Sequence, residues 1–228
     1  MRFQDAARDA RAIVYAGVQA DPLVARSAEL LSEATRGQLL LARAVMNGET
    51  IDAGGWRATF PALFMAGRPE ARERAEAILE VSLAVAGRGE EMRSQYRGAI
   101  VESLTERLLV RRVGGDAVRR ERRVLFDGVP AEIHPYDVTV EIPGAVEIYD
   151  CKWGARGINA DVLLQLDAAR ANAASEGIAL AVALVVFDAQ RSCLVRLARQ
   201  TVPRGGIRLV TIETIRSLAK ALPAPTTT

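Results

Sequence analysis

Two aspartates and a lysine lie in the sequence at a spacing that could bring their side chains together. They fall in the stretch 137–152, DVTVEIPGAVEIYDCK, as Asp137, Asp150 and Lys152. Apolar and polar residues alternate on both sides of Pro143-Gly144, which is the pattern of two β-strands joined by a turn. The stretch therefore predicts a β-hairpin that carries all three side chains.

The turn decides how the two strands of this hairpin pair. Proline cannot adopt a positive φ, so a two-residue type I′ loop is excluded, whereas an even-length loop such as four residues around a type I or II turn is allowed. With the turn centred on Pro143-Gly144, Asp137 lies opposite Asp150 with Cβ atoms about 4.5–5.5 Å apart. Lys152 then projects from the same face as Asp150. Glu147 and Cys151 point to the other face.

Facing carboxylates repel each other unless positive charge lies between them. A hard divalent cation such as Mg²⁺, which prefers oxygen ligands, fits that position. Such a cation polarises a phosphate and lowers the pKa of a bound water, and an adjacent lysine stabilises negative charge on the water or the phosphate. The three residues are therefore suited to hydrolysing a phosphodiester bond.

The choice of lysine at position 152 is itself informative. The chain has 30 basic residues, of which only Lys152 and Lys220 are lysines. A compact ammonium is not interchangeable with the planar, always charged guanidinium of arginine. A lysine inside the hairpin of an arginine-rich chain indicates a specific role, the alternative being chance placement.

The order of these residues resembles the PD-(D/E)XK nuclease superfamily, which has the restriction-endonuclease-like fold. The first motif reads His-Pro-Tyr-Asp here, so the proline stands two places before Asp137 rather than one. The second motif is Asp150-Cys151-Lys152. The resemblance covers about residues 95–190 and depends on the order of helix, strand, hairpin, helix and strand, because the Asp-x-Lys motif alone is short.

The resemblance implies a metal-dependent nuclease with DNA as its substrate, RNA being the open alternative. It also implies a glutamate on the helix before the hairpin. Glu102 matches, because Gly98 stands four residues before it, and Glu106 one turn later is the alternative. Glu102, Asp137 and Asp150 would then bind one or two Mg²⁺ or Mn²⁺ ions.

Two further residues complete the site that the resemblance implies. The backbone carbonyl of Cys151 could add a metal ligand, and Lys152 would assist the attacking water. Gln165, on the helix after the hairpin, matches a glutamine that family members often carry near the metal. An ordinary exposed glutamine is the alternative for that position.

Arginines gather just before the hairpin and once after it. Residues 107–123 contain seven arginines against two acidic residues, and Arg156 follows Lys152 in a glycine-rich loop. Such a run either lines a phosphate-binding surface, with salt-dependent affinity, or is a solvated face. The residues assigned to nucleic-acid binding are Arg119, Arg120, Arg122, Arg123 and Arg156.

Composition narrows the remaining classes. The 228 residues are 50% hydrophobic with a net charge of +2, so nucleic-acid affinity must come from local patches. The single histidine, His134, rules out sites built from two histidines. Two cysteines, no signal-peptide pattern, and no stretch near the roughly 18 uncharged apolar residues of a membrane span predict a cytosolic protein without membrane contact.

The fold expected from these patterns is α/β, with a restriction-endonuclease-like mixed β-sheet flanked by helices and preceded by an all-helical N-terminal region. The expected parts are a helical region over 1–89, a nuclease-like domain over 90–222 and a disordered tail over 223–228. Apolar periodicity and caps predict helices over 3–19, 22–46, 69–86, 90–112 and 161–176, with an irregular connection over 49–68. Strands are expected over 123–126, 178–187, 193–197 and 207–212, with a last helix from about residue 211.

Two other functions stay open at this point. The C-terminal domain could be a catalytically silent nucleic-acid-binding or scaffolding subunit, although the intact Asp137, Asp150 and Lys152 argue against decay. Alternatively, the helical region could gate an effector nuclease in response to an activating ligand or partner protein. Nucleases of this kind that cut both strands often work as dimers, so a homodimer is expected.

Overall fold

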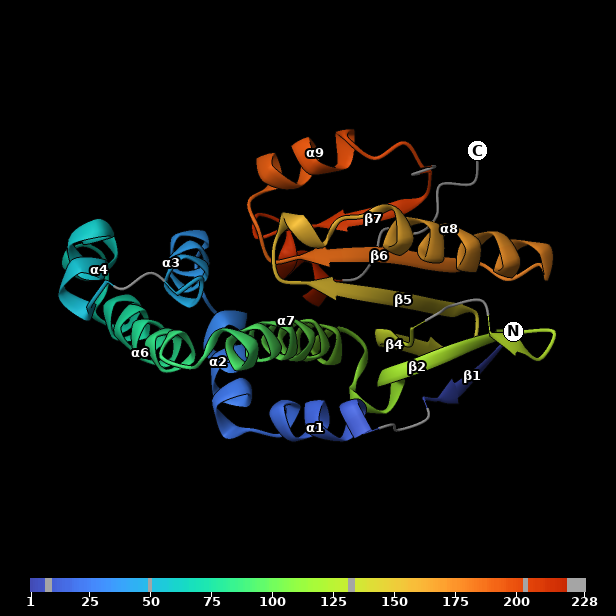
Figure 1. Cartoon of the computed structure of the whole chain (residues 1–228), viewed down its shortest axis with the longest axis horizontal. Helices are drawn as coiled ribbons and strands as arrows, with labels where there is room; N and C mark the ends of the chain where they lie inside the picture. The colour runs from blue at the N-terminus through green and yellow to red at the C-terminus, as the bar shows by residue number, and fades with distance from the viewer. Residues whose placement is uncertain (7–9, 49–50, 131–133, 203–204, 221–228) are drawn as a thin grey trace.

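The computed structural model describes residues 1–6, 10–48, 51–130, 134–202 and 205–220. Its centre is a β-sheet with helices on both faces, and a further group of helices extends from one end of the sheet (Figure 1). The sheet combines antiparallel and parallel neighbours. The predicted class, α/β with a mixed sheet flanked by helices, is therefore confirmed.

Within the described ranges the sheet has seven strands: β1 (Arg2–Asp5), β2 (Val118–Phe126), β3 (Val129–Pro130), β4 (Tyr136–Ile142), β5 (Ala145–Lys152), β6 (Leu180–Val186) and β7 (Ile207–Val210). Six of them lie in the order β1-β2-β4-β5-β6-β7, and β3 pairs with β2. Neighbours are antiparallel from β1 to β5 and parallel from β5 to β7. Parallel neighbours need a crossover connection, and a helix lies in each of these two crossovers.

The α-helices are α1 (Ala10–Gln19), α2 (Pro22–Ser32), α3 (Arg36–Met46), α4 (Ala53–Thr59), α5 (Pro61–Met65), α6 (Pro69–Ala86), α7 (Glu90–Val113), α8 (Ala160–Ser175) and α9 (Gln190–Ala198). Three 3₁₀ helices are η1 (Gly115–Ala117), η2 (Ala155–Gly157) and η3 (Ile215–Ala219). Helices α3 to α6 form the group beyond the end of the sheet (Figure 1). No helix in the described part of the chain has the length and apolar character needed to cross a membrane.

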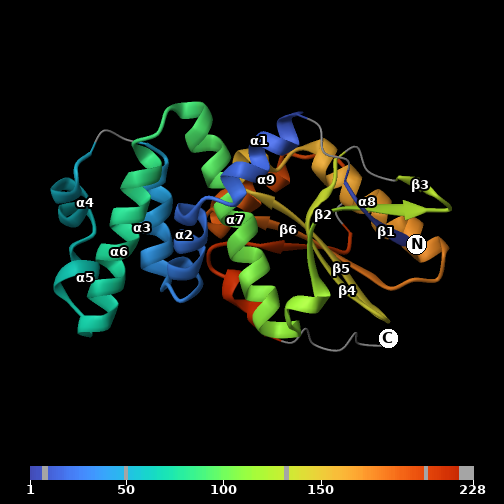
Figure 2. The ribbon, with the colours of Figure 1, turned by 90° about the horizontal axis from the view of Figure 1, so that it is seen from below.

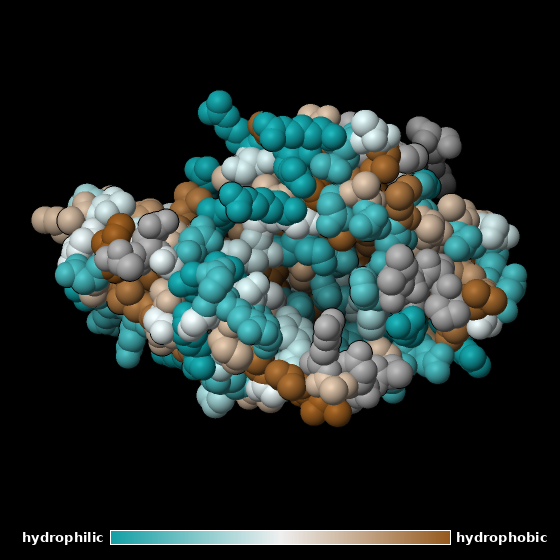
Figure 3. Space-filling model, viewed as in Figure 1, coloured by the Kyte–Doolittle hydropathy of each residue, from teal (hydrophilic) through white to brown (hydrophobic). Residues whose placement is uncertain are grey.

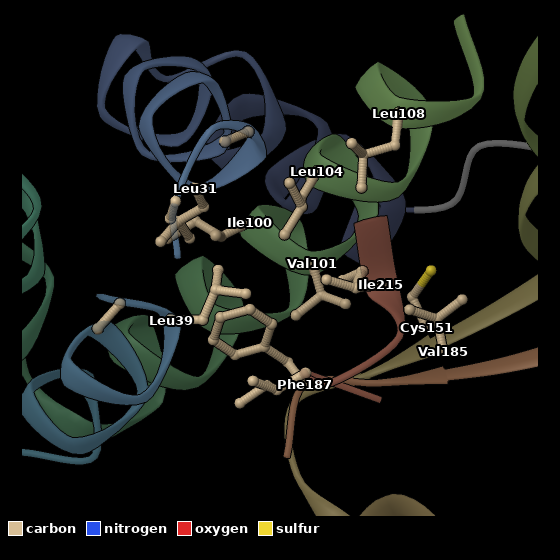
Figure 4. Close-up of a cluster of buried hydrophobic side chains, with 14 of the residues drawn as sticks. Leu31, Leu39, Ile100, Val101, Leu104, Leu108, Cys151, Val185, Phe187 and Ile215 are labelled. Carbon is tan, nitrogen blue, oxygen red and sulfur yellow. The ribbon is translucent and has the colours of Figure 1, made fainter. Parts of the chain in front are cut away.

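Helix α7 covers one face of the sheet and α8 the other (Figure 2). Leu104 and Leu108 of α7 belong to a buried cluster that also contains Leu39 of α3 and Val185 of β6, so this core joins the helical group to the sheet (Figure 4). Strand β6 serves both faces, because Val185 lies in the α7 cluster and Leu184 in the α8 cluster. The prediction of a central strand covered on both sides is confirmed.

The hairpin of β4 and β5 has the predicted register. Ile142 pairs with Ala145, and Val138 pairs with Tyr149. The two residues between the strands are Pro143 and Gly144, and Gly144 has φ +80°, which the third position of a type II turn requires. Continued by one residue, this register places Asp137 opposite Asp150.

The start of the chain differs from the prediction. Residues 2–5 form β1 rather than the beginning of a helix, and α1 begins only at Ala10. Phe3 of β1 pairs with Val124 of β2, which is far away in the sequence. Local periodicity carries no information about such a pairing, so the strand could not be read from it.

The single helix expected over 22–46 is in fact two helices, α2 and α3. The side chain of Thr35 accepts a hydrogen bond from the Gln38 N–H, and the Gln38 side chain accepts one from the Thr35 N–H. This capping box satisfies the donors at a new helix start and explains the break. The irregular connection expected over 49–68 also contains helices, α4 and α5, which begin after Asp52 and at Pro61.

The strand expected over 193–197 is wrong, because these residues belong to α9. Cys193 is buried there, whereas Leu194 and Val195 are about half exposed. A short apolar run does not distinguish a strand from a helix. The strand expected over 123–126 is the end of the longer β2, and the last expected helix is the 3₁₀ helix η3.

The division of the chain at residue 89 stays a prediction. Position 89 lies between α6 and α7, and β1 shows that the N-terminal part also contributes a strand to the sheet. The predicted disordered tail, 223–228, lies outside the described residues.

A buried ion pair connects the end of α7 to β5. Arg112 Nη2 donates to Glu147 Oε2 at 2.6 Å, and their side chains are only 5% and 9% exposed. The hydroxyl of Tyr149 also donates to Glu147 Oε2. We predict that Arg112→Met lowers the free energy of unfolding by about 3–5 kcal/mol, because Glu147 is left as an uncompensated buried charge.

The matched test is a double-mutant cycle measured by chemical denaturation. Arg112→Met combined with Glu147→Leu removes both charges and should recover most of the loss. If the double variant is as unstable as Arg112→Met alone, the loss of stability comes from altered packing and not from the unpaired carboxylate of Glu147.

Candidate active site

Helix α7 delivers Glu102 to the end of the sheet as a buried carboxylate, 6% exposed. Two side chains of α1 hold it: the Tyr15 hydroxyl donates to Oε1 at 2.5 Å, and Gln19 Nε2 donates to Oε2 at 2.8 Å. Burial raises the pKa of Glu102, and these two hydrogen bonds and the nearby Arg120 oppose that rise. The carboxylate is therefore oriented before any ligand arrives.

Gly98 makes the contact between Tyr15 and Glu102 possible. A Cβ atom at position 98 would lie 3.0 Å from the Tyr15 hydroxyl oxygen. A glycine within a helix costs roughly 1 kcal/mol relative to alanine, so its presence needs a local reason. The reason visible here is space for the tyrosine that holds Glu102, one turn further along α7.

Glu121 of β2 adds another carboxylate to this network. Gln19 Nε2, which holds Glu102, also lies 3.1 Å from Glu121 Oε1. Glu121 has φ +50°, uncommon for a residue other than glycine, and interrupts the pairing of β2 with β4 at the position opposite Asp137. Its negative charge contributes to the raised pKa of Glu102. The ladder between β2 and β4 is therefore interrupted at the position where the acidic residues gather.

Asp137 is fixed by the opposite strand. Its Oδ2 accepts a hydrogen bond from the Cys151 backbone N–H at 2.5 Å. The pKa of Asp137 is raised well above its usual value, first by burial among protein atoms and then by the charges of Asp150 and Glu102. Lys152 and the Cys151 N–H oppose the rise without cancelling it. Asp137 thus experiences the like-charge repulsion expected from the hairpin.

Lys152 supplies the positive charge next to this pair. Its ammonium forms an ion pair with Oδ1 of Asp150, a carboxylate that is 7% exposed. Burial alone would lower the pKa of Lys152, but the carboxylates of Asp137 and Asp150 outweigh burial and raise it. The lysine is therefore a cation that can stabilise negative charge, and not a neutral amine that could accept a proton.

The charge and chemistry of these residues suit a hard divalent cation. Glu102, Asp137 and Asp150 offer only oxygen donors, and the one ammonium of Lys152 does not balance three carboxylates. Among the residues described, however, no group of three or more His, Cys, Asp or Glu side chains is arranged to hold a metal ion. The donors fit the ion, but their spacing is not that of an assembled ligand set.

The side chain of Cys151 contacts α7 and, among the residues described, forms no hydrogen bond with these acids. Its thiol donates to Thr105 Oγ1 at 3.5 Å, and burial raises its pKa well above the usual value. The thiol is therefore neutral and directed to α7. A contribution of Cys151 to metal binding would come from its backbone, as the resemblance implies.

Beyond Lys152 the chain forms one wall of a cavity of about 650 Å³. The cavity is lined by Lys152, Arg156 and Gly157 from the hairpin side and by Arg43 and Arg97 from the helical side. Its face of the molecule has a central hollow with a mostly hydrophilic border (Figure 3). Four cationic side chains, together with the carboxylates of Glu90 and Asp188, therefore surround a space that begins at the lysine of the site.

Specific contacts hold the loop that forms this wall. The Ala155 N–H donates to Asp188 Oδ2 at 2.9 Å, and the Trp153 ring stacks on Phe187 with centroids 5.0 Å apart. A Cβ atom at Gly157 would lie 2.8 Å from the Cβ of Lys152, so only glycine allows the loop to pack against the lysine stem. The loop is thus built around Lys152.

The remaining predicted residues lie in different surroundings. Gln165 of α8 donates to the carbonyl oxygen of His134 at 3.0 Å, so it braces the segment before β4 and not the carboxylates. Glu106, the alternative to Glu102, forms an ion pair with Arg120. Glu102, by contrast, interacts electrostatically with Asp137. The structure thus brings together Glu102, Asp137, Asp150 and Lys152, but not Gln165.

The predicted arginines divide into two groups. On β2, Arg120 pairs with Glu106, and Arg122 pairs with Glu141 at 2.8 Å and with Asp5. Arg119 donates to backbone carbonyls at the start of the strand, and Arg123 lies partly exposed further along it. Arg156 alone of the five lines the cavity beside Lys152. Arg43 and Arg97 also line it, and nothing in their local sequence indicated this.

Comparisons of the chain with protein-family models, with curated proteins and with solved structures found no match. The function must therefore be inferred from the residues and geometry described above. Tyr15, Gln19 and Glu121 belong to that geometry, although the sequence offered no motif that would have identified them.

We predict that Tyr15→Phe weakens Mn²⁺ binding about 10- to 100-fold, because residues that hydrogen-bond to a metal ligand orient it, as Tyr15 does for Glu102. Calorimetric titration with Mn²⁺ measures this effect, and thermal unfolding shows whether the fold is kept. Tyr96→Phe is the matched control, since the Tyr96 hydroxyl donates instead to Asp21, the residue before α2. Equal affinity of the Tyr15 and Tyr96 variants would show that the hydroxyl of Tyr15 does not prepare Glu102.

We also predict that Asp137→Asn stabilises the metal-free protein by about 1 kcal/mol, or roughly 2–4 °C in Tm. The amide oxygen can still accept from Cys151, while the like charge is removed. Because the pKa of Asp137 is raised on folding, the folded wild type binds more protons, and its stability falls as pH rises from the unfolded pKa through the folded one.

Melting curves in EDTA over a pH series test this prediction. The gain of Asp137→Asn over wild type should be small in acid and should grow with pH to a plateau. Asp116→Asn removes a charge from an exposed residue of η1 and serves as the control. A loss of stability in Asp137→Asn, or a gain that does not change with pH, would contradict the raised pKa.

Proposed function

We propose that this protein is a metal-dependent nuclease of the PD-(D/E)XK type, which hydrolyses phosphodiester bonds in nucleic acid. The observation that carries the proposal is the hairpin register. It sets Asp137 opposite Asp150, with Lys152 ion-paired to Asp150. The buried Glu102 on the preceding helix and the mixed sheet between helices support a restriction-endonuclease-like arrangement.

In this proposal each residue has a definite task. Mg²⁺ or Mn²⁺, held by Glu102, Asp137, Asp150 and the carbonyl of Cys151, would polarise the phosphate and lower the pKa of the attacking water. Lys152 keeps its proton and stabilises negative charge on that water or on a phosphate oxygen. Tyr15 and Gln19 hold Glu102, and the Cys151 N–H holds Asp137, so that the carboxylates are oriented in advance.

The proposal of DNA as the substrate follows from the resemblance to the superfamily. Only an experiment decides between DNA and RNA. Phosphate recognition has support in the cavity at Lys152. Arg156 lines it without a carboxylate partner among the described residues, whereas Arg43 pairs with Asp188 and Arg97 with Glu90. An unpaired arginine can bind phosphate through two parallel hydrogen bonds. If each copy cuts only one strand, a homodimer would be needed to cut both strands of a duplex.

One observation favours the gated form of this function. Helix α3 contacts the segments that follow β5 and β6. Arg43 Nη2 lies 2.5 Å from Oδ2 of Asp188, which follows β6, and Trp153 Nε1, after β5, donates to Oδ1 of Asn47 at the end of α3 at 2.9 Å. A ligand or partner that moves α3 would therefore also move the loop that packs on Lys152. A silent scaffold, by contrast, gives no reason for the intact acidic site.

We predict that wild type cleaves DNA only with Mg²⁺ or Mn²⁺, and that Lys152→Ala lowers the rate at least 100-fold, because a preorganised charge at the reacting phosphate is removed. Cleavage of supercoiled, linear and single-stranded DNA and of RNA, with metal or EDTA, measures this and names the substrate. Lys220→Ala is the matched control, since it removes the chain's other lysine from an exposed position.

The outcomes separate the three functions. Cleavage that needs metal and is lost only in Lys152→Ala supports the nuclease. A metal-induced rise in Tm without cleavage points to the gated form and a missing activator. The absence of both cleavage and a metal-induced rise in Tm would overturn the proposal in favour of a scaffold.

A further inference from the structure

A second hollow adjoins the cavity at Lys152. It has a volume of about 430 Å³ and lies between the loop after β5 and one face of α9. Ala155 and Arg156 line both hollows, so the two form a continuous surface. Arg196 Nε of α9 donates to the Ile158 carbonyl at 3.0 Å, which fixes α9 against this loop.

This surface is rich in positive charge that acidic residues do not neutralise. Its arginines are Arg156, Arg191, Arg196 and Arg199. In the part of the chain that the structure describes, none of the four lies within 4.0 Å of a carboxylate, whereas Arg120 and Arg122 of β2 do. Arg156, Arg191 and Arg199 are also exposed. These guanidinium groups are therefore available to an anionic ligand.

The spacing along α9 suits an extended polyanion. Arg191, Val195 and Arg199 recur every four residues and so share one face of α9, a helix that contacts η2. Eight residues of helix span about 12 Å. This length corresponds to three or four base-pair steps of about 3.4 Å measured along the axis of a duplex. Ser192 adds a hydroxyl donor on the same face.

We propose that Arg156 and the arginine face of α9 bind the phosphate backbone of a nucleic-acid strand that runs from the Lys152 cavity across α9. The inference rests on the proposed nuclease function, because it identifies the surface along which that substrate lies. It places the backbone on α9 in preference to the arginine run of β2. Contacts to phosphate carry no base information, so the surface positions the strand without selecting a sequence.

The test compares two double variants of the full chain that lose the same charge. Arg191→Gln/Arg199→Gln removes the exposed ends of the α9 surface and keeps Arg196, which has a structural contact. Arg68→Gln/Arg72→Gln removes two arginines at the start of α6, on the other side of the molecule from α9 (Figure 1). Thermal unfolding of both variants checks that they are folded.

Binding of a fluorescent 20-base-pair DNA is measured in EDTA, where a metal-dependent nuclease does not cut, over a series of salt concentrations. The α9 variant should bind at least 10-fold more weakly at low salt, and the slope of log affinity against log salt should fall by about one to two. The α6 variant should match wild type. Equal weakening of the two variants, or an unchanged salt slope, would overturn the α9 surface.

Cleavage by the same proteins keeps this inference separate from the function on which it rests. If wild type cleaves with metal and the α9 variant shows a raised KM with little change in kcat, both stand. If wild type cleaves and the α9 variant binds and cleaves like wild type, the surface alone is wrong. If wild type neither binds nor cleaves DNA or RNA, and metal does not raise its Tm, the proposed function and the surface fail together.

Discussion

The repulsion between Asp137 and Asp150 is the constraint on which the rest of this structure depends. A turn at Pro143-Gly144 and the burial of alternate residues fix the register that sets them opposite each other. A slip of one residue would move every side chain of a strand to the other face of the sheet, and with it the core residues of that strand. The hydrophobic packing of α7 and α8 therefore holds two like charges together that would otherwise separate.

The partners of these charges come from distant parts of the chain. Lys152 lies on the hairpin itself, but Glu102 comes from α7, and its partners Tyr15 and Gln19 come from α1. The N-terminal segment thus contributes both an edge strand and the hydrogen bonds that orient a carboxylate. A helical region that looks separate in sequence is, in the folded protein, part of the support of the site.

What the sequence predicted and what it missed follow from the range of the interactions. The hairpin register, helix α8 and the buried strand β6 depend on neighbouring residues, and all three were predicted. The pairing of β1 with β2 joins segments that are far apart in the sequence. The hydrogen bond from Tyr15 of α1 to Glu102 of α7 likewise joins residues that are 87 positions apart. Gly98 stands within a predicted helix, but only the structure shows that its missing side chain leaves room for the Tyr15 hydroxyl.

The arginines show most clearly that local sequence does not reveal contacts between distant residues. The arginine run of β2 is the densest basic stretch near the hairpin, yet Arg120 and Arg122 face carboxylates brought from α7, β4 and β1. The sparser arginines of α9 have no such partners within the described residues. Because an ion pair largely cancels the field of both members, the availability of a charge depends on tertiary pairing and not on local density. Unbalanced carboxylates at the end of the hairpin and unbalanced guanidinium groups beside them are then two parts of one field. Under the proposed function, this field would attract a divalent cation to the carboxylates and a polyanion to the adjacent surface.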